Sequence, residues 1–369
     1  MRKSALFWFG LVVTALVALG LVILASASEA NAYRLHGDVY FFIKRQSLYL
    51  IAGIVVAVLA SLFDYHKWRD YEFLSWAFFV VVLILLVVVF KFPAINGSHR
   101  WISLGPIRLQ PSELAKMLTV ILLAVWLDKS GWRVELFMRG AFWPAALMGV
   151  VALPVLFEPD FGSVMVIGLA GLLMMFVAGA RLLHILPFAL CGVAVVAFKV
   201  LTNENRVARL FDESKQYQVK MALTAIANAD IWGAGLGESM QKHLYLPEAH
   251  TDFVFAVGAE ELGIVFSLSV VLLFVAFFAL SVYIARKASD RFGRFLVIGM
   301  AFIIFFQAMF NIGVVCKALP TKGMALPFFS YGGTNLLSAF FAVGTILSVG
   351  IHSYREKKRA FVNKVLLRT

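Results

Sequence analysis

The chain has 369 residues, of which 62% are hydrophobic and only 15% are charged, and its formal net charge at pH 7 is +12. Apolar runs long enough to cross a bilayer recur along the whole chain and have no polar face, which excludes a soluble globular protein. The sequence therefore predicts an all-α, polytopic integral membrane protein. The basic residues are distributed as membrane topology requires, so they do not indicate a nucleic-acid partner.

The first apolar run, from Leu6 to Ala25, follows two basic residues and precedes the small-residue stretch SASEANA, as a secretory signal would. At about 20 residues it is longer than the usual signal core of about 7 to 15 residues. We therefore interpret it as a retained first span, with a cleaved signal peptide as the alternative.

About ten transmembrane helices are predicted, in one transmembrane domain that covers residues 1–369. The predicted spans are 6–26, 46–63, 73–91, 114–127, 143–157, 162–180, 183–201, 262–285, 295–316 and 334–352. An even number of spans places both termini on one side, and the segments on that side hold more Lys and Arg than the short loops opposite. The N and C termini are therefore predicted to be cytoplasmic. Residues 353–369 form a basic cytoplasmic tail, and residues 202–261 form a large extracytoplasmic loop between helices 7 and 8.

Every motif-like polar stretch then falls on the outer side of the membrane. These stretches are INGSHRWISLGPIRLQPSEL (95–114), EPDFG (158–162), the loop of residues 202–261, and KALPTKGMALPFFSYGGTN (317–335). The inner connections are mostly short and basic, and we expect no comparable group of polar residues there. The outer surface is therefore the predicted working surface.

Two of these stretches carry ionisable residues beside predicted spans. Glu113 and Lys116 are three residues apart on one helix face, just inside the membrane, where ionisable groups usually face an interior or a cavity. We predict a functional role for them, with a structural ion pair as the alternative. Asp160 is either functional or part of a tight turn.

The stretch SYGGTN opens the last predicted span with Ser330, Gly332, Gly333 and Thr334. Free backbone N–H groups at a helix start can hold an anion such as a phosphate, although a plain turn would also explain the glycines. The glycines of GAGLGES (233–239) predict no nucleotide site, because no strand precedes them and no Gly-Lys-Ser/Thr follows.

The strongest candidate for a catalytic residue is Asp252, in YLPEAHTDFVFAVGAEELG (245–263). It lies close to a predicted span, beside Phe253 and Phe255, whose apolar surroundings could raise its pKa toward the range of a general base. We interpret His250 as a residue that orients Asp252, because no pair of outer histidines has metal-ligand spacing. A solvated loop carboxylate is the alternative for Asp252.

In their order on ten spans, YLPEAHTDFVFAVGAEELG, RLQPSELAK, EPDFGS and LPFFSYGGTN resemble the SEDS family of peptidoglycan glycosyltransferases, over nearly the whole chain. The resemblance implies a multi-pass protein of the bacterial cytoplasmic (inner) membrane that polymerises lipid II, an undecaprenyl-pyrophosphate-linked disaccharide peptide, on the outer face. It also implies a class B penicillin-binding protein transpeptidase and other division or elongation proteins as partners.

The family's essential aspartate corresponds to Asp252. The other polar positions that match are Arg108, Gln110, Ser112, Glu113, Lys116, Asp160, His250 and the turn from Ser330 to Thr334. The stretch GESMQKHLYLPEAHTDF is similar to the FtsW and SpoVE branch, and it favours a role in cell division, because Ala249 stands where RodA proteins tend to have an arginine. Lys317 and Lys322 depart from the family pattern and add positive charge beside the expected anion site.

Polymerisation of an activated lipid-linked sugar needs a base for the acceptor hydroxyl and cations for the departing pyrophosphate, but no nucleotide cofactor. Asp252 is the expected base, and a single base suggests direct displacement with inversion. The expected pyrophosphate contacts are Arg108, Lys116, Lys317, Lys322 and the N–H groups of Gly332 and Gly333, assisted by a divalent cation such as Mg or Mn on Glu113 or Asp160. A transporter that flips lipid II and a non-catalytic scaffold are the alternatives.

Overall fold

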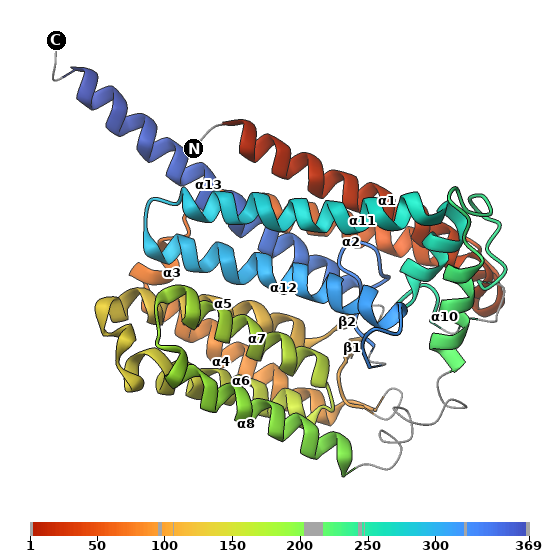
Figure 1. Cartoon of the computed structure of the whole chain (residues 1–369), viewed down its shortest axis with the longest axis horizontal. Helices are drawn as coiled ribbons and strands as arrows, with labels where there is room; N and C mark the ends of the chain where they lie inside the picture. The colour runs from red at the N-terminus through yellow and green to blue at the C-terminus, as the bar shows by residue number, and fades with distance from the viewer. Residues whose placement is uncertain are drawn as a thin grey trace.

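The structure, a computed structural model, describes residues 3–94, 98–105, 107–202, 217–242, 246, 248–320 and 323–366. Long helices run side by side along one direction and form a bundle (Figure 1). Helices are expected here, because a bilayer offers the backbone no water and each N–H and C=O group must be satisfied within its own segment.

The elements follow one another in chain order. They are α1 (Lys3–His36), α2 (Phe41–Leu62), α3 (Lys67–Asp70), α4 (Glu72–Val88), η1 (Val89–Lys91), β1 (Ile102–Leu104), β2 (Ile107–Leu109), α5 (Pro111–Ser130), η2 (Gly131–Glu135), η3 (Met138–Phe142), α6 (Trp143–Phe157), α7 (Phe161–Ala178), α8 (Leu182–Leu201), α10 (Tyr217–Ala227), α11 (Val254–Arg286), α12 (Arg291–Val315) and α13 (Gly333–Leu366). The two short strands pair antiparallel, and all other described elements are helical.

Nine helices in the described part of the chain are long and apolar enough to cross a membrane. The helix that this set leaves out is α5, which is 20 residues long but carries Glu113, Lys116, Asp128 and Lys129. It packs against α4, α6, α7 and α12, and 15 of its residues are buried. Protein rather than lipid therefore surrounds Glu113 and Lys116, while Asp128 and Lys129 lie at the other end of the helix, so α5 completes the predicted set of ten spans.

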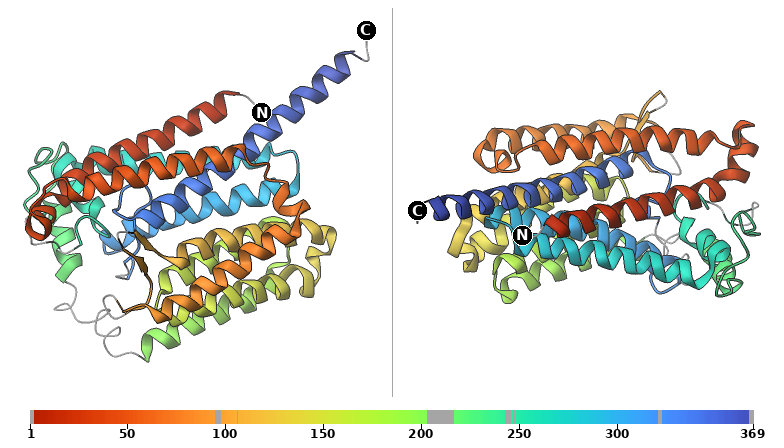
Figure 2. Two further views of the ribbon diagram at one scale, coloured as in Figure 1. Left: turned by 180° about the vertical axis from the view of Figure 1, so that it is seen from behind. Right: turned by 90° about the horizontal axis from the view of Figure 1, so that it is seen from above.

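Both chain ends lie at one end of the bundle, and the β1–β2 hairpin and α10 lie at the opposite end (Figures 1 and 2). This agrees with the even number of spans predicted from the sequence. We refer to the end with the termini as the cytoplasmic end and to the other as the outer end, following the distribution of Lys and Arg.

The boundary predicted for the large outer loop is wrong at its C-terminal side. Residues 254–261 belong to α11, which begins at Val254 and has a kink at Gly263 (φ 74°, ψ −165°). The backbone of residues 231–235 lies against this kink, where the N–H groups of Ala234 and Gly235 donate to the carbonyl oxygens of Glu260 and Glu261 at 3.0 and 2.9 Å. Apart from Glu260 and Glu261 this segment consists of apolar and small residues, and tertiary contacts hold it, with its two glutamates, as a helix.

Two other helices extend beyond their predicted ends. Helix α1 continues to His36, and its 34 residues correspond to about 51 Å, so its outer part projects beyond a hydrocarbon core of about 30 Å. Helix α13 continues to Leu366, so the basic tail is helical over most of its length. The outer part of α1 places Ser26 and Asn31 in contact with the segments that precede α11.

The orientation predicts which residues a membrane-impermeant thiol reagent can reach. In a variant without Cys191 and Cys316, a cysteine at the exposed Met240 should react with reagent added to intact cells, whereas one at the exposed Lys358 should react only after permeabilisation. Mass-tag labelling followed by electrophoresis measures both. The reverse pattern would place the candidate site described below in the cytoplasm.

Candidate functional site

Four segments that are far apart in the sequence meet at the outer end of the bundle. They are the loop before α11 with Asp252, the segment 323–332, the start of α13, and the β1–β2 hairpin with the start of α5 (Figure 1). The turn from Ser330 to Thr334 lies at the centre, because it forms hydrogen bonds with the segments on both sides.

Hydrogen bonds to main-chain atoms hold the Asp252 loop in place. The Ser330 hydroxyl donates to the carbonyl oxygen of Thr251 at 2.6 Å, and the N–H group of Tyr331 donates to that of His250 at 2.9 Å. On α12, the buried side-chain amide of Asn311 donates to the carbonyl oxygens of Asp252 and Met324, both at 2.7 Å. The position of Asp252 is therefore fixed from two sides, by α12 and by the turn that precedes α13.

The side chain of Asp252 is half-buried and lies against Gly323. A Cβ atom built on Gly323 would lie 2.4 Å from Oδ2 of Asp252, so only glycine leaves room for the carboxylate in this position. The flanking Phe253 and Phe255 are 5% and 3% exposed and anchor the loop in the core, as their apolar character predicts. Asp252 is thus a positioned carboxylate and not a freely solvated one.

His250 supports the same loop. Its ring centroid lies 4.6 Å from that of Phe42, and its Nδ1 atom lies 3.5 Å from the side-chain amide of Asn31. Burial lowers the pKa of His250, so the imidazole is neutral at neutral pH. The predicted orienting role is therefore exerted through the ring packing and the backbone of the loop.

Thr334 connects the start of α13 to the hairpin. Its hydroxyl donates to the carbonyl oxygen of Arg108 at 2.9 Å and accepts from the N–H group of Gln110 at 3.2 Å. The Ser330 hydroxyl likewise donates to one group, the carbonyl oxygen of Thr251, and accepts from another, the N–H group of Leu326 at 2.7 Å. The side chains of Ser330 and Thr334 therefore hold the segments of the site together.

The two glycines of the turn differ in their surroundings. A Cβ atom on Gly333 would lie 2.9 Å from the ring of Tyr49, whereas one on Gly332 would meet only Asn335, at 3.8 Å. The N–H group of Gly332 donates to Gln46 Oε1 at 3.3 Å. Gly333 begins α13, and the first N–H groups of a helix have no acceptor within the helix. The start of α13 therefore remains the candidate for anion binding.

Two arginines lie near Tyr331 in this turn. Burial raises the pKa of Tyr331, with a contribution from Tyr49, and the positive charges of Arg45 and Arg108 oppose that shift. Arg108 is exposed and Arg45 is half-buried, with its guanidinium 4.5 Å from the ring centroid of Phe41. Arg45 was not predicted as a site residue. Its position as a charged residue at the outer start of a span could have indicated it.

Of the two lysines expected to add positive charge here, the structure describes Lys317. Lys317 is exposed and follows α12 with a φ of 57°, in the left-handed region. Lys322 lies outside the described residues.

Asp160 holds together the starts of α5 and α7. It caps α7, and its Oδ2 atom accepts from the hydroxyls of Ser163 at 2.7 Å and Ser112 at 3.1 Å and from the side-chain amide of Gln110 at 3.3 Å. These contacts are those of a structural carboxylate, and they place Gln110 between Asp160 and Thr334.

The neighbouring Glu158 is fully buried, and neither of its carboxylate oxygens has a hydrogen-bond partner among the described residues. Burial and, second, the charge of Asp160 raise the pKa of Glu158 to about 8, against an opposing contribution from Arg100. Glu158 is therefore mostly protonated at neutral pH.

Glu113 and Lys116 form the predicted ion pair, at 2.7 Å, and are 6% and 1% exposed. The pair lies within α5, below the hydrogen-bonded layer that Ser112 and Asp160 form. Lys116 is therefore separated from the outer surface, and this geometry corresponds to the structural alternative. Substrate contact by either residue stays a prediction.

The residues suggested for a divalent cation do not fit one in this arrangement. Asp160 accepts hydrogen bonds from three side chains, and Glu113 is paired with Lys116. Within the described ranges, no group of three or more His, Cys, Asp or Glu residues is placed to hold a metal ion.

Glu260 and Glu261 attach the loop of residues 233–242 to α11. Glu260 accepts from the Ser239 hydroxyl, and Glu261 accepts from the Ser26 hydroxyl at 2.5 Å and lies 3.4 Å from Nζ of Lys242. These contacts hold residues 233–242 against α11. The GAGLGES stretch (233–239) therefore packs on the kinked start of this helix.

The cytoplasmic end has its own polar cluster, so the expectation of none there is wrong. Asp290, which caps α12, accepts from the Tyr65 hydroxyl at 3.0 Å and from Arg69 at 3.1 Å, and lies 3.4 Å from His66. The contact with Asp290 raises the pKa of His66 to about 9, so His66 is charged at neutral pH. The residues come from separate connections, which the sequence does not show to be neighbours. They tie α12 to the connection between α2 and α4.

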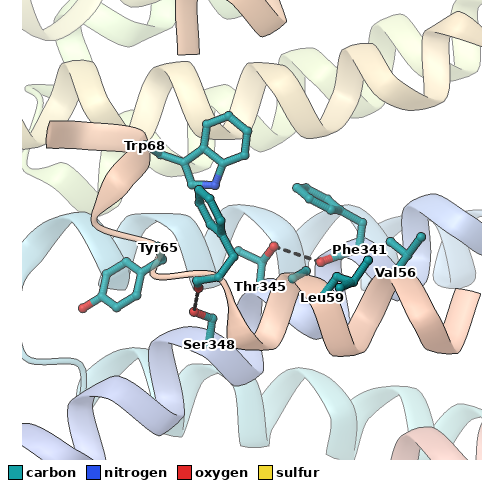
Figure 3. Close-up of a pocket in the computed structure, with 9 residues that line it drawn as sticks. Val56, Leu59, Tyr65, Trp68, Phe341, Thr345 and Ser348 are labelled. Atoms are coloured by element: carbon teal, nitrogen blue, oxygen red, sulfur yellow. Dashed lines mark hydrogen bonds between the residues drawn. The ribbon is translucent and has the colours of Figure 1, made fainter. Parts of the chain in front are cut away.

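An apolar cavity of about 270 Å³ lies beside this cluster, between α2, α13 and the connection that contains Tyr65 and Trp68 (Figure 3). The three hydroxyl side chains of its lining donate within the protein: Ser348 to the carbonyl oxygen of Phe63, Thr345 to that of Phe341, and Tyr65 to Asp290. The cavity lies at the cytoplasmic end of the bundle and is separate from the Asp252 loop.

Comparison with known proteins relates the whole chain to one family. The model of the FtsW/RodA/SpoVE family, described as "Cell cycle protein", matches residues 6–355. A probable peptidoglycan glycosyltransferase FtsW from Thioalkalivibrio sulfidiphilus is 41% identical over 91% of this chain and 87% of its own length. The corresponding protein of Escherichia coli O6:H1 is 36% identical over 98% of this chain and 89% of its own length.

Solved structures give the same relationship. The crystal structure of the rod shape determining protein RodA from Thermus thermophilus superposes with a TM-score of 0.73 and 27% identity, covering 94% of this chain and 97% of that one. A structure described as showing structural coordination of polymerization and crosslinking by a peptidoglycan synthase complex gives a TM-score of 0.69 and 26% identity, covering 94% and 98%.

Proposed function

The chain belongs to the FtsW/RodA/SpoVE family of cell cycle proteins, and on that premise we propose that it polymerises lipid II into glycan strands on the outer face of the membrane. It is a multi-pass protein of the bacterial inner membrane and a peptidoglycan glycosyltransferase that serves cell division and wall synthesis. The observation that best supports lipid II as substrate is the hydrogen-bonded arrangement that places Asp252 and two arginines around one turn at the outer end.

In the proposed reaction, Asp252 acts as the general base. Its carboxylate accepts the proton of the acceptor sugar hydroxyl as the oxygen attacks the anomeric carbon of the donor. The bond between that carbon and the pyrophosphate oxygen breaks, and the lipid pyrophosphate leaves with the electron pair. Because no protein nucleophile intervenes, the configuration at the anomeric carbon is inverted. The contacts of Asn311 and Ser330 act indirectly, by holding the backbone that carries the base.

The departing pyrophosphate gains negative charge, which Arg108, Arg45 and the start of α13 can stabilise. Arginine suits this task because its planar guanidinium forms paired hydrogen bonds with phosphate oxygens. Lys317 adds positive charge at the outer end of α12. We derive no step through a metal ion; a requirement for Mg or Mn stays a prediction, which polymerisation in the presence of a chelator would test.

We also propose a class B penicillin-binding protein as the partner that crosslinks the new strands. The support is the structural neighbour described as a peptidoglycan synthase complex that coordinates polymerisation and crosslinking. Residues 232–242 and the outer part of α1 are available for such a contact, since Trp232 is 77%, Met240 72% and Tyr33 67% exposed.

Polymerisation of purified lipid II by the purified protein, with and without this partner, tests the proposal directly. Glycan strands should appear on a polyacrylamide gel in the presence of the partner. A transporter or a scaffold would yield no polymer under any of these conditions, and that result would overturn the proposal.

The proposed pyrophosphate contacts predict how the removal of a single positive charge changes the use of lipid II. Arg108→Gln should raise the apparent KM for lipid II about tenfold, because a charged hydrogen bond to phosphate is lost. Lys44→Gln is the matched control, since Lys44 is also exposed at the outer end but is paired with Asp38 at 2.8 Å. Initial rates over a range of lipid II concentrations measure both. An equal effect of the two substitutions would point to general surface charge rather than a site at Arg108.

A further inference from the structure

A second cavity, of about 260 Å³, lies at the cytoplasmic end between α4, α5, η3 and α6. Its apolar wall consists of Leu122 and Val125 from α5 and Leu147 from α6. Trp76 from α4 and Trp126 from α5 complete the aromatic part of the lining. The cavity is at the opposite end of the bundle from Asp252, so it is separate from the proposed active site.

The segment beside this cavity has the composition of a membrane interface. In residues 131–143, Trp132, Met138 and Trp143 are 75%, 57% and 49% exposed, and they alternate with Arg133 and Arg139. Exposed tryptophans with neighbouring arginines are typical of the level of the lipid headgroups. The mouth of the cavity is therefore expected to face the headgroups of the inner leaflet.

The charged groups of the lining leave an excess of positive charge. Lys129 and Arg139 contribute two positive charges, and Glu72, which is paired with Lys129, contributes one negative charge. Within the described residues, the guanidinium of Arg139 takes part in no ion pair. The backbone of Arg139 is fixed, because its carbonyl oxygen accepts from the indole N–H of Trp126 at 2.9 Å.

We propose that this cavity binds an anionic phospholipid of the inner leaflet. Its phosphate group contacts Arg139 and Lys129, and the upper part of one acyl chain lies against Leu122, Val125 and Leu147. Basic pockets between membrane helices on the cytoplasmic side bind lipid headgroups in this way. A soluble anion would leave the apolar wall uncovered, and a zwitterionic lipid would bring a second cation beside Arg139.

Native mass spectrometry of the full chain, titrated with phosphatidylglycerol or with phosphatidylcholine of the same acyl chains, tests the proposal. The wild-type protein should retain phosphatidylglycerol preferentially. Arg139→Gln should reduce that retention about fivefold, as expected for the loss of one cation at the membrane surface. Arg294→Gln removes one charge from an exposed position at the same end of the bundle, in the first turn of α12, and should change nothing.

A second variant tests the cavity itself. Leu147→Trp keeps every charge but fills the space between α5 and α6, so it should also reduce the retention of phosphatidylglycerol. Equal retention of the two lipids by the wild-type protein would overturn the proposal, as would equal losses in Arg139→Gln and Arg294→Gln. Because the readout is lipid retention, these outcomes do not depend on whether the protein polymerises lipid II.

Discussion

Replacing Asp252 by asparagine is expected to lower the rate of glycan polymerisation by about 100-fold or more. The amide has nearly the size of the carboxylate but cannot accept the proton of the acceptor hydroxyl. The fold should be retained, because the amide fills the same space and the contact from Asn311, which donates to the carbonyl oxygen of residue 252 at 2.7 Å, is unchanged. The variant should also bind lipid II, and the loss of a negative charge near the pyrophosphate should tighten binding slightly. The rate is measured with purified lipid II and the partner transpeptidase.

The matched control is Glu248→Gln, which makes the same change from acid to amide in the same loop. Glu248 is exposed, and among the described residues its carboxylate accepts from the Thr251 hydroxyl alone, at 2.9 Å, so its loss should leave the rate within about twofold. Near-normal polymerisation by Asp252→Asn would exclude Asp252 as the base. The buried Glu260 and Glu261 would be poor replacements, because both are occupied in holding residues 233–242.

The spans and the working face of this protein could be predicted from sequence because both depend on local properties. An apolar run of about 20 residues crosses a bilayer whatever it packs against, and Lys and Arg counts orient it. The predicted boundary between the outer loop and α11 was wrong, because contacts between segments distant in the sequence determine where this helix begins. Residues 254–261 end in two adjacent glutamates, but Ser239 donates to Glu260 and Lys242 lies beside Glu261, so the segment forms a helix that begins at Val254.

Most ionisable residues of the candidate site were named from the sequence, Arg45 excepted, whereas the polar residues that hold the site in place were not. Asp252, Arg108 and Asp160 are recognisable as charges beside apolar runs. Gln46 and Asn311 lie within spans and differ little from other polar residues there, since their partners are main-chain atoms about 280 and 60 residues away in the sequence. Such pairings depend on how the helices pack, and a single sequence does not contain that information.

The side chains of Ser330 and Thr334 have structural partners that the sequence does not show. Both residues were predicted to bind substrate, in a turn whose backbone N–H groups could hold an anion. In the structure each hydroxyl donates to one backbone carbonyl and accepts from one backbone N–H group, which joins the Asp252 loop and the hairpin to the start of α13. Substrate contact by either residue stays a prediction.

The position of the carboxylate can be tested without altering Asp252. Gly323→Ala places a Cβ atom 2.4 Å from Oδ2 of Asp252, and the carboxylate, as the end of a flexible side chain, is what must move. Since a displacement of about 1 Å can cost up to about 100-fold in rate, we expect polymerisation to fall by between about 10-fold and 100-fold. The thermal unfolding midpoint should change little, because no backbone atom is displaced.

Gly332→Ala is the matched control, since it makes the same change in the neighbouring turn. Its Cβ atom meets only Asn335, at 3.8 Å, and the hydrogen bond from its N–H group to Gln46 is kept, so polymerisation should stay close to the wild-type rate. Comparing the two alanines separates displacement of Asp252 from a general sensitivity of the outer loops. If Gly323→Ala were as active as Gly332→Ala, the carboxylate would not need the position against Gly323 during the reaction, and the base would have to act from another conformation of the loop.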